Sequence, residues 1–170
     1  MVTQLSTTHA TFMIERRYPA SPARVFAAWS RPDFKLSWFF CHPDWRVEDY
    51  GLDFRVGGRE WLKTGPRRGP VHAYDACYHD IVAERRLIYS YEMHVGDQRL
   101  SVSLVTVEFE GRDGGTRMTF TEQGAYLEGR DGPAEREHGT RVGLDNLATH
   151  LQREPAGPSE AMFLQSGRQT

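Results

Sequence analysis

Hydrophobic and polar residues are arranged along the chain in a pattern that predicts one strand, two short helices, six further strands and a long final helix. Within the predicted strand 100–109, Val105, Val107 and Phe109 alternate with the polar Thr106 and Glu108, which is typical of a strand with one buried face. Within 133–153, Leu144, Leu147 and Leu151 recur at helical spacing instead. The other predicted strands are 11–18, 45–50, 53–63, 71–82, 86–95 and 116–123, and the short helices are 22–30 and 33–40.

The connections between these elements restrict their arrangement. Short segments rich in glycine, proline and polar residues separate consecutive strands, so we expect the strands to form one antiparallel sheet. The final helix is the only predicted element long enough to cover a face of that sheet. We therefore expect an α+β fold over 10–153, with a curved antiparallel sheet of six to seven strands wrapped around a long C-terminal helix, and a tail at 154–170. Such an arrangement leaves a cavity between sheet and helix unless side chains fill it.

Composition and charge exclude several classes of protein. The 170 residues are 39% hydrophobic and 12% aromatic, as expected of a folded domain and not of a disordered chain. The net charge of −2 lacks the basic excess needed for binding a nucleic-acid backbone. No apolar stretch approaches the length of a membrane span, and the polar start at 1–11 is unlike a signal peptide. We expect a soluble, cytoplasmic protein that binds neither nucleic acid nor membrane.

Residues that could bind metals or cofactors are scattered along the chain. The cysteines Cys41 and Cys77 form no CxxC motif, and we expect both to be reduced. No pair of histidines has HxH or HxxxH spacing with a carboxylate nearby. We expect Gly57 and Gly58 to lie inside a strand, as a bend or bulge that curves the sheet, and not in a dinucleotide-binding loop. The sequence predicts no metal and no cofactor.

Large aromatic side chains lie near that glycine pair. Trp38 and Phe39 belong to the second short helix, whereas Phe54 and Trp61 flank the glycines. Glycines have no side chain to fill space, whereas the neighbouring aromatic residues have large ones. This combination is suited to the wall of a cavity. Rings of this kind are equally common in an ordinary core, and for Trp38 and Phe54 both interpretations stay open. For Trp61, in the middle of a predicted strand, we expect the cavity wall.

Glu122 is the most informative polar residue of the sequence. It continues the inward-facing series of Met118 and Phe120 at the two-residue period of a strand. A carboxylate that faces an apolar space must be paired, hydrated or protonated. Glu122 is therefore a hydrogen-bonding group for a ligand or a general acid or base, unless it lies close enough to the strand end to reach water or an arginine. We favour ligand contact over catalysis.

Two glycines interrupt the final helix on one of its faces. Gly139 and Gly143 lie four residues apart, and each costs about 1 kcal/mol relative to alanine inside a helix. Close approach of the helix to the sheet or to a ligand would explain both. Close packing alone is the interpretation we favour.

Several segments together resemble one known superfamily. They are 18–29, Trp38–Phe39, 53–58, 105–109, 115–117 and 144–147. With them the chain resembles the START-like (Bet v 1-type, SRPBCC) superfamily, in the branch related to the C-terminal domain of the activator of the Hsp90 ATPase. The resemblance covers roughly 12–151 and implies the helix-grip fold, but none of the segments is a catalytic signature. The family often has a Gly-Trp pair in the last helix, whereas in this chain Gly139 is followed by Thr140. The family also often has a histidine at the end of the last strand, where this chain has Glu122.

The cavity and the resemblance together favour a small-molecule binding protein that holds a hydrophobic or aromatic ligand between sheet and helix. One alternative is an enzyme similar to the polyketide cyclases and aromatases of the superfamily, for which Glu122 is the best catalytic candidate. Another is a chaperone-interaction module, against which the absence of the activator's N-terminal domain argues. A homodimer fits the architecture, although no sequence feature requires it. The residues expected to contact the ligand are Trp38, Phe39, Phe54, Trp61, His72, Tyr74, Tyr91, Glu122, Thr140 and Leu144.

Overall fold

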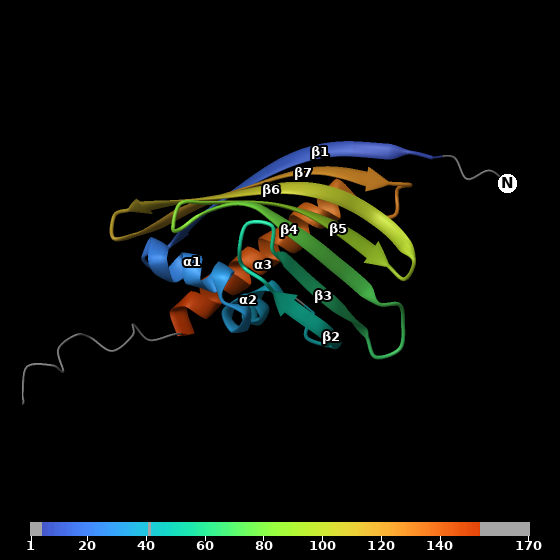
Figure 1. Ribbon diagram of the computed structural model, residues 1–170, viewed down its shortest axis with the longest axis horizontal. Coiled ribbons are helices and arrows are strands. Elements are labelled where there is room, and N and C mark those ends of the chain that lie inside the picture. Colours follow the sequence, from blue (N-terminus) through green and yellow to red (C-terminus); the bar gives the residue numbers. More distant parts are fainter. Residues whose placement is uncertain (1–4, 41, 154–170) are drawn as a thin grey trace, which may run out of the picture.

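A curved antiparallel sheet wraps around a long helix, and two shorter helices lie at one end of its concave side (Figure 1). The computed structural model describes residues 5–40 and 42–153. The seven strands have the order β1-β7-β6-β5-β4-β3-β2, so that the first strand pairs with the last. The strands are β1 (Thr7–Tyr18), β2 (Trp45–Leu52), β3 (Arg59–Pro66), β4 (His72–Val82), β5 (Arg86–Val95), β6 (Gln98–Arg112) and β7 (Gly115–Leu127). The helices are α1 (Pro22–Ser30), α2 (Pro32–Phe39) and α3 (Pro133–Arg153).

The α+β helix-grip architecture expected from the sequence is confirmed. The bounds of α1 and α3 agree with the predicted ranges 22–30 and 133–153. Ser21 caps α1, because its Oγ accepts a hydrogen bond of 3.3 Å from the backbone N–H of Arg24, and Pro22 occupies the first helical position. Local capping and the hydrophobic period therefore suffice to place both helices.

The connection between β2 and β3 differs from the prediction. β3 begins at Arg59, and the glycine pair lies in the preceding turn and not inside a strand. Gly57 has a φ of +80°, which favours glycine, and its N–H donates to the carbonyl of Tyr78. The N–H of Tyr78 in turn donates to the carbonyl of Gly58. The glycines thus fasten the turn to β4 instead of bending a strand.

The core lies between the sheet and the helices. Leu144, Leu147 and Leu151 of α3 are buried, as their spacing predicts, and the hydroxyl of Tyr18 on β1 donates to the carbonyl of Leu144 at 3.1 Å. This bond joins the first strand to the last helix and holds α3 against the sheet.

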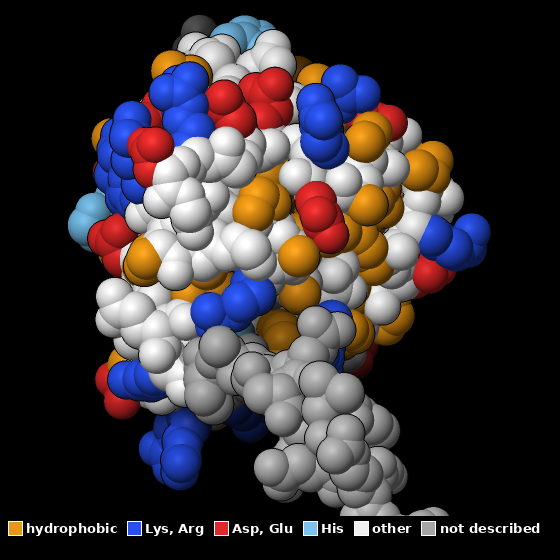
Figure 2. Space-filling model, turned by 90° about the vertical axis from the view of Figure 1, so that its left-hand side faces the viewer, with side chains coloured by type: hydrophobic (Ala, Val, Ile, Leu, Met, Phe, Trp, Pro, Cys, Tyr) orange, Lys and Arg blue, Asp and Glu red, His pale blue; other side chains and the backbone are white. Residues whose placement is uncertain are grey.

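The surface seen in Figure 2 carries basic and acidic side chains interspersed with apolar ones, in keeping with the small net charge. Among the described residues, no helix is both long and apolar enough to cross a membrane. Cys77 is a free thiol. Cys41 and the predicted tail at 154–170 lie outside the described residues.

Candidate ligand-binding site

A cavity of about 810 Å³ lies between α3 and the concave face of the sheet. The three helices and strands β3 to β7 contribute side chains to its wall. Most of the wall is apolar, and many of its side chains are aromatic. The aromatic lining residues are Trp29, Trp38, Phe39, Phe40, Tyr74, Tyr89, Tyr91 and Phe120.

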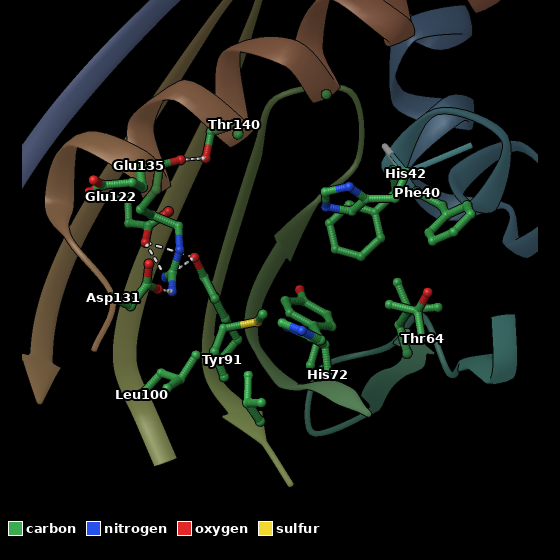
Figure 3. A pocket seen from close by; sticks show the side chains of 18 of the residues that line it. Phe40, His42, Thr64, His72, Tyr91, Leu100, Glu122, Asp131, Glu135 and Thr140 are labelled. Atoms are coloured by element: carbon green, nitrogen blue, oxygen red, sulfur yellow. Dashed lines mark hydrogen bonds and ion pairs between the residues drawn. The ribbon is translucent and has the colours of Figure 1, made fainter. Parts of the chain in front are cut away.

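A polar cluster forms the wall on the side of α3 (Figure 3). At its centre is Glu122 of β7, which is 1% exposed. Its Oε1 atom accepts hydrogen bonds from the hydroxyls of Tyr91 at 2.7 Å and Ser103 at 2.8 Å. The same oxygen forms an ion pair of 3.2 Å with Nη1 of Arg136 on α3. The paired state that burial of a carboxylate requires is therefore reached through an arginine of the facing helix.

Arg136 is held from both ends of its guanidinium group. Nη1 also donates to the hydroxyl of Tyr91 at 2.7 Å, while Nη2 donates to Oγ of Ser101 at 2.7 Å and to Oδ2 of Asp131 at 2.5 Å. Burial by itself would lower the pKa of Arg136, but the nearby hydroxyl of Tyr91 and the carboxylates of Glu122 and Asp131 raise that pKa above its usual value. The arginine stays charged at any pH at which the protein is folded.

Some polar atoms of this wall have no partner. Oε2 of Glu122 is buried and accepts no hydrogen bond from the described residues. The hydroxyl of Tyr74, which also lines the cavity, is likewise buried and lacks a hydrogen-bond partner within that part of the chain. Buried polar atoms are almost always paired in native proteins, so unpaired ones in a cavity wall point to a further molecule.

The rings of His42, Trp45 and His72 lie in contact with one another, and both histidines line the cavity. His42 stacks on Trp45 with ring centroids 4.0 Å apart, and Trp45 contacts His72 at 4.5 Å. Burial lowers the pKa of His72, and the nearby His42 lowers it further. His72 is therefore neutral at pH 7, and it presents an aromatic face with little charge to the cavity.

A second buried ion pair lies behind the aromatic wall. Nζ of Lys35 on α2 is 3.1 Å from Oε2 of Glu60 on β3, and both side chains are fully buried. The hydroxyls of Tyr50 and Tyr78 complete the hydrogen bonding of Glu60 at 3.2 and 2.9 Å. Burial lowers the pKa of Lys35, and Glu60 offsets part of that effect.

Four rings separate this pair from the cavity. Nζ of Lys35 lies 4.7 Å from the ring centroid of Trp29 and 4.6 Å from that of Phe39, with Trp38 and Tyr89 slightly farther away. All four rings line the cavity. Because a cation over a ring face is an attractive contact, Lys35 stabilises the arrangement of these rings.

Most of the residues predicted to contact a ligand lie in the cavity wall, but two do not. Phe54 packs in the core against Phe26 and Tyr78, with ring centroids 5.6 and 5.1 Å apart. The cavity is lined, among others, by Trp38, Phe39, His72, Tyr74, Tyr91, Glu122, Thr140 and Leu144.

Trp61 lies on the opposite face of the sheet, and the prediction that it lines the cavity is wrong. Its indole ring covers Gly51 of β2, and its Nε1 donates to Oδ2 of Asp49 at 3.0 Å. The two-residue period of β3 instead directs Glu60 and Leu62 inward, and both are buried. The prediction rested on the position of Trp61 after the glycine pair, and the two-residue period of the strand overrides it.

Gly139 faces open space and not a packed surface. It borders the cavity, and a Cβ atom built at this position would meet nothing within 4 Å. The close packing expected for Gly139 is therefore absent. A glycine here widens the cavity beside α3.

Sequence reasoning missed the charged residues that pair with the buried carboxylates. Arg136 precedes Thr140 by one helical turn, so the position of Thr140 facing the cavity could have identified it. Lys35 lies one turn before the apolar positions of α2 and carries no such signal, because a lysine in a short surface helix is ordinarily exposed.

Comparisons with known proteins agree with this architecture. Residues 19–153 match the family described as Activator of Hsp90 ATPase homolog 1-like protein. An uncharacterised protein of Rhizobium leguminosarum is 52% identical, with 89% of this chain and 100% of that chain covered and a TM-score of 0.85. The protein Mll3558 of Rhizobium loti is 42% identical, with 85% and 99% covered and a TM-score of 0.80.

More distant structures share the fold. The solution structure of an AHSA1-like protein of Aeromonas hydrophila is 23% identical, with 84% of this chain and 92% of that chain covered and a TM-score of 0.64. A comparison with curated proteins finds no match. The resemblance inferred from the sequence segments is confirmed.

Proposed function

Since the chain belongs to the family of activator of Hsp90 ATPase homolog 1-like proteins, we propose that it is a small-molecule binding protein, which holds a hydrophobic or aromatic ligand in the cavity between α3 and the sheet. The single observation that carries the proposal is the cavity of about 810 Å³ with its aromatic wall. Cavities that bind small molecules usually measure about 300–1,000 Å³ and are lined by apolar side chains with a few polar groups. The cavity fits this description in both size and lining.

The distribution of polar groups in the wall supports the same proposal. The rings of Trp29, Trp38 and Phe120 line one part, whereas the cluster around Glu122 and Arg136 lies on the side of α3. A ligand with an apolar body and one polar end would match both parts at once. Most of its binding free energy would come from burial of apolar surface, and the polar end would set its orientation.

The proposal is tested with a variant that fills the cavity without disturbing the fold. Gly139→Leu adds a side chain where a Cβ meets nothing within 4 Å, in a helix that leucine favours over glycine. His138→Leu is the matched control, since His138 is exposed on the same helix and is not a lining residue. Binding is measured as the fluorescence increase of N-phenylnaphthylamine, a neutral aromatic probe, together with the thermal midpoint of each protein.

We expect saturable binding to the unchanged protein and to His138→Leu. For Gly139→Leu, affinity should fall by about tenfold or more, which corresponds to at least 1.4 kcal/mol, while the thermal midpoint stays the same or rises. Binding that is not saturable, or that is equally strong in Gly139→Leu, would show that the probe does not occupy this cavity.

A further inference from the structure

The polar cluster around Glu122 and Arg136 contains more negative than positive charge. Arg136 is the single cation of the cluster, and it lies between the carboxylates of Glu122 and Asp131. One negative charge is thus left in excess. The described residues that line the cavity have the same excess, since Arg130 and Glu135 add one charge of each sign.

The donors of the cluster are largely occupied. Both terminal nitrogens of Arg136 already donate to oxygen atoms, and the hydroxyl of Tyr91 donates to Glu122. An arginine in a ligand cavity ordinarily suggests a carboxylate or phosphate ligand. Here an anionic group would compete with two carboxylates that already bind the arginine. It would also lose its hydration without gaining a bidentate contact, because both terminal nitrogens of the guanidinium group are occupied.

The acceptors of the cluster are not all occupied. Glu122 is 99% removed from solvent, as its exposure of 1% shows, and its Oε2 accepts no hydrogen bond from residues 5–40 or 42–153. Asp131 forms its contact to Arg136 through Oδ2, and its side chain keeps 19% exposure. A buried carboxylate oxygen without a partner leaves a strong acceptor unsatisfied beside the cavity.

We propose that the polar end of the ligand is a hydrogen-bond donor, either a hydroxyl or an amine, that the Glu122–Asp131 side of the cluster accepts, and that ligands ending in a carboxylate or phosphate are rejected. This inference rests on the proposed function, because it specifies the chemical class of the molecule in the same cavity. The role of Arg136 is then to position Glu122 and to compensate part of its charge, not to bind the ligand's polar group.

The aromatic wall favours the same class of ligand. The face of an aromatic ring carries partial negative charge, which attracts cations and repels anions. The nearby cation of Lys35 does not reverse this preference, because Glu60 pairs with it at 3.1 Å behind the rings. His72, with its lowered pKa, adds no positive charge at pH 7. An apolar amine or alcohol is therefore electrostatically compatible with both the aromatic wall and the polar cluster around Glu122.

The inference is tested with three ligands of one shape and different polar ends. Naphthylmethanol, naphthylmethylamine and naphthoate compete with N-phenylnaphthylamine for the unchanged protein at pH 7. We expect the alcohol and the amine to displace the probe at concentrations about tenfold lower than naphthoate, a difference of roughly 1.4 kcal/mol. The measurement is repeated with Glu122→Gln, with Asp131→Asn, and with the control Glu137→Gln, which removes the same charge from a residue of α3 that does not line the cavity.

Glu122→Gln and Asp131→Asn should each reduce the preference for the amine over naphthoate by severalfold, whereas Glu137→Gln should leave it unchanged. Asp131→Asn keeps the test valid if Glu122→Gln unfolds, because Asp131 is only partly buried. Equal affinities for all three compounds, or a preference for naphthoate, would overturn this inference while the proposed function stands. Failure of every compound to bind saturably would overturn the proposed function itself.

Discussion

Replacing Lys35 with methionine should destabilise the protein more than any surface substitution. At the observed 3.1 Å between Nζ and the carboxylate of Glu60, the attraction is about 5 kcal/mol for an effective dielectric constant of 20. Desolvation of both charges opposes this gain, so the net contribution of the pair is much smaller. Removing one partner alone is costly, at about 3–5 kcal/mol, because the other charge stays buried.

The structure places Lys35→Met near the lower end of that range. Glu60 keeps two hydrogen bonds from Tyr50 and Tyr78 when the lysine is removed, and methionine preserves the apolar contacts with the surrounding rings. We expect a loss of about 3 kcal/mol in the free energy of unfolding. Adding Glu60→Gln removes the unpaired charge. The double variant should therefore lose about 2 kcal/mol less free energy of unfolding than the losses of the two single variants added together.

Urea unfolding followed by tryptophan fluorescence and circular dichroism measures these differences. Lys63→Met serves as the control, since Lys63 is the other lysine of the chain and is exposed on β3; its effect should stay within about 0.5 kcal/mol. The reasoning is refuted if Lys35→Met costs no more than Lys63→Met, or if the effects of Lys35→Met and Glu60→Gln simply add.

Two further predictions concern stability. Burial raises the pKa of all seven tyrosines above their usual value of 10.0, and it raises the pKa of Tyr126 to about 12. The stability that depends on these neutral hydroxyl groups is therefore fully present below about pH 10 and is lost as the pH rises above it. Tyrosinate absorbance and circular dichroism should therefore change together in a cooperative alkaline transition; gradual ionisation near pH 10 with the fold intact would contradict this. Gly51→Ala should destabilise the protein by about 1–3 kcal/mol, because the new methyl group would overlap the ring of Trp61. Gly139→Ala, which meets nothing within 4 Å, should leave stability unchanged or raise it by up to about 1 kcal/mol, and equal effects of the two variants in urea unfolding would refute the assignment.

Much of the fold follows from local patterns. The helical spacing of leucines predicts α3, the cap at Ser21 predicts α1, and alternation predicts the inward face of β7 and of the second half of β6. In the first half of β6 the apolar Val102 and Leu104 are exposed and the polar Ser101 and Ser103 are buried, so alternation fails there. The β2–β3 connection is harder to predict from the sequence. Phe54 and Val56 alternate within the segment 53–58 and give it the pattern of a strand. The segment is a turn in which the N–H of Gly58 donates to the carbonyl of Arg55, and the hydrogen bonds between the glycine pair and Tyr78 attach it to β4. The contact with β4 depends on tertiary structure, which the local sequence does not encode.

The site is less accessible to sequence reasoning than the fold. Glu122 could be found because a strand's period determines which residues face the core. Its partner Arg136 lies on another element, α3. The pairing depends on where α3 crosses the sheet, and no local sequence pattern encodes that position. The same limitation applies to Lys35 and Glu60, which are 25 residues apart in the sequence and meet only through packing.

The pairing of β1 with β7 determines when the protein can complete its fold during synthesis. Strands β2 to β7 pair with their sequence neighbours and can form as soon as each leaves the ribosome. Residues of β1, in contrast, pair with partners from Thr116 to Leu127, so the first strand must wait for the last. At typical rates of synthesis that delay is on the order of 5–20 s, during which the apolar face of β1 is available to chaperones or to other unfinished chains.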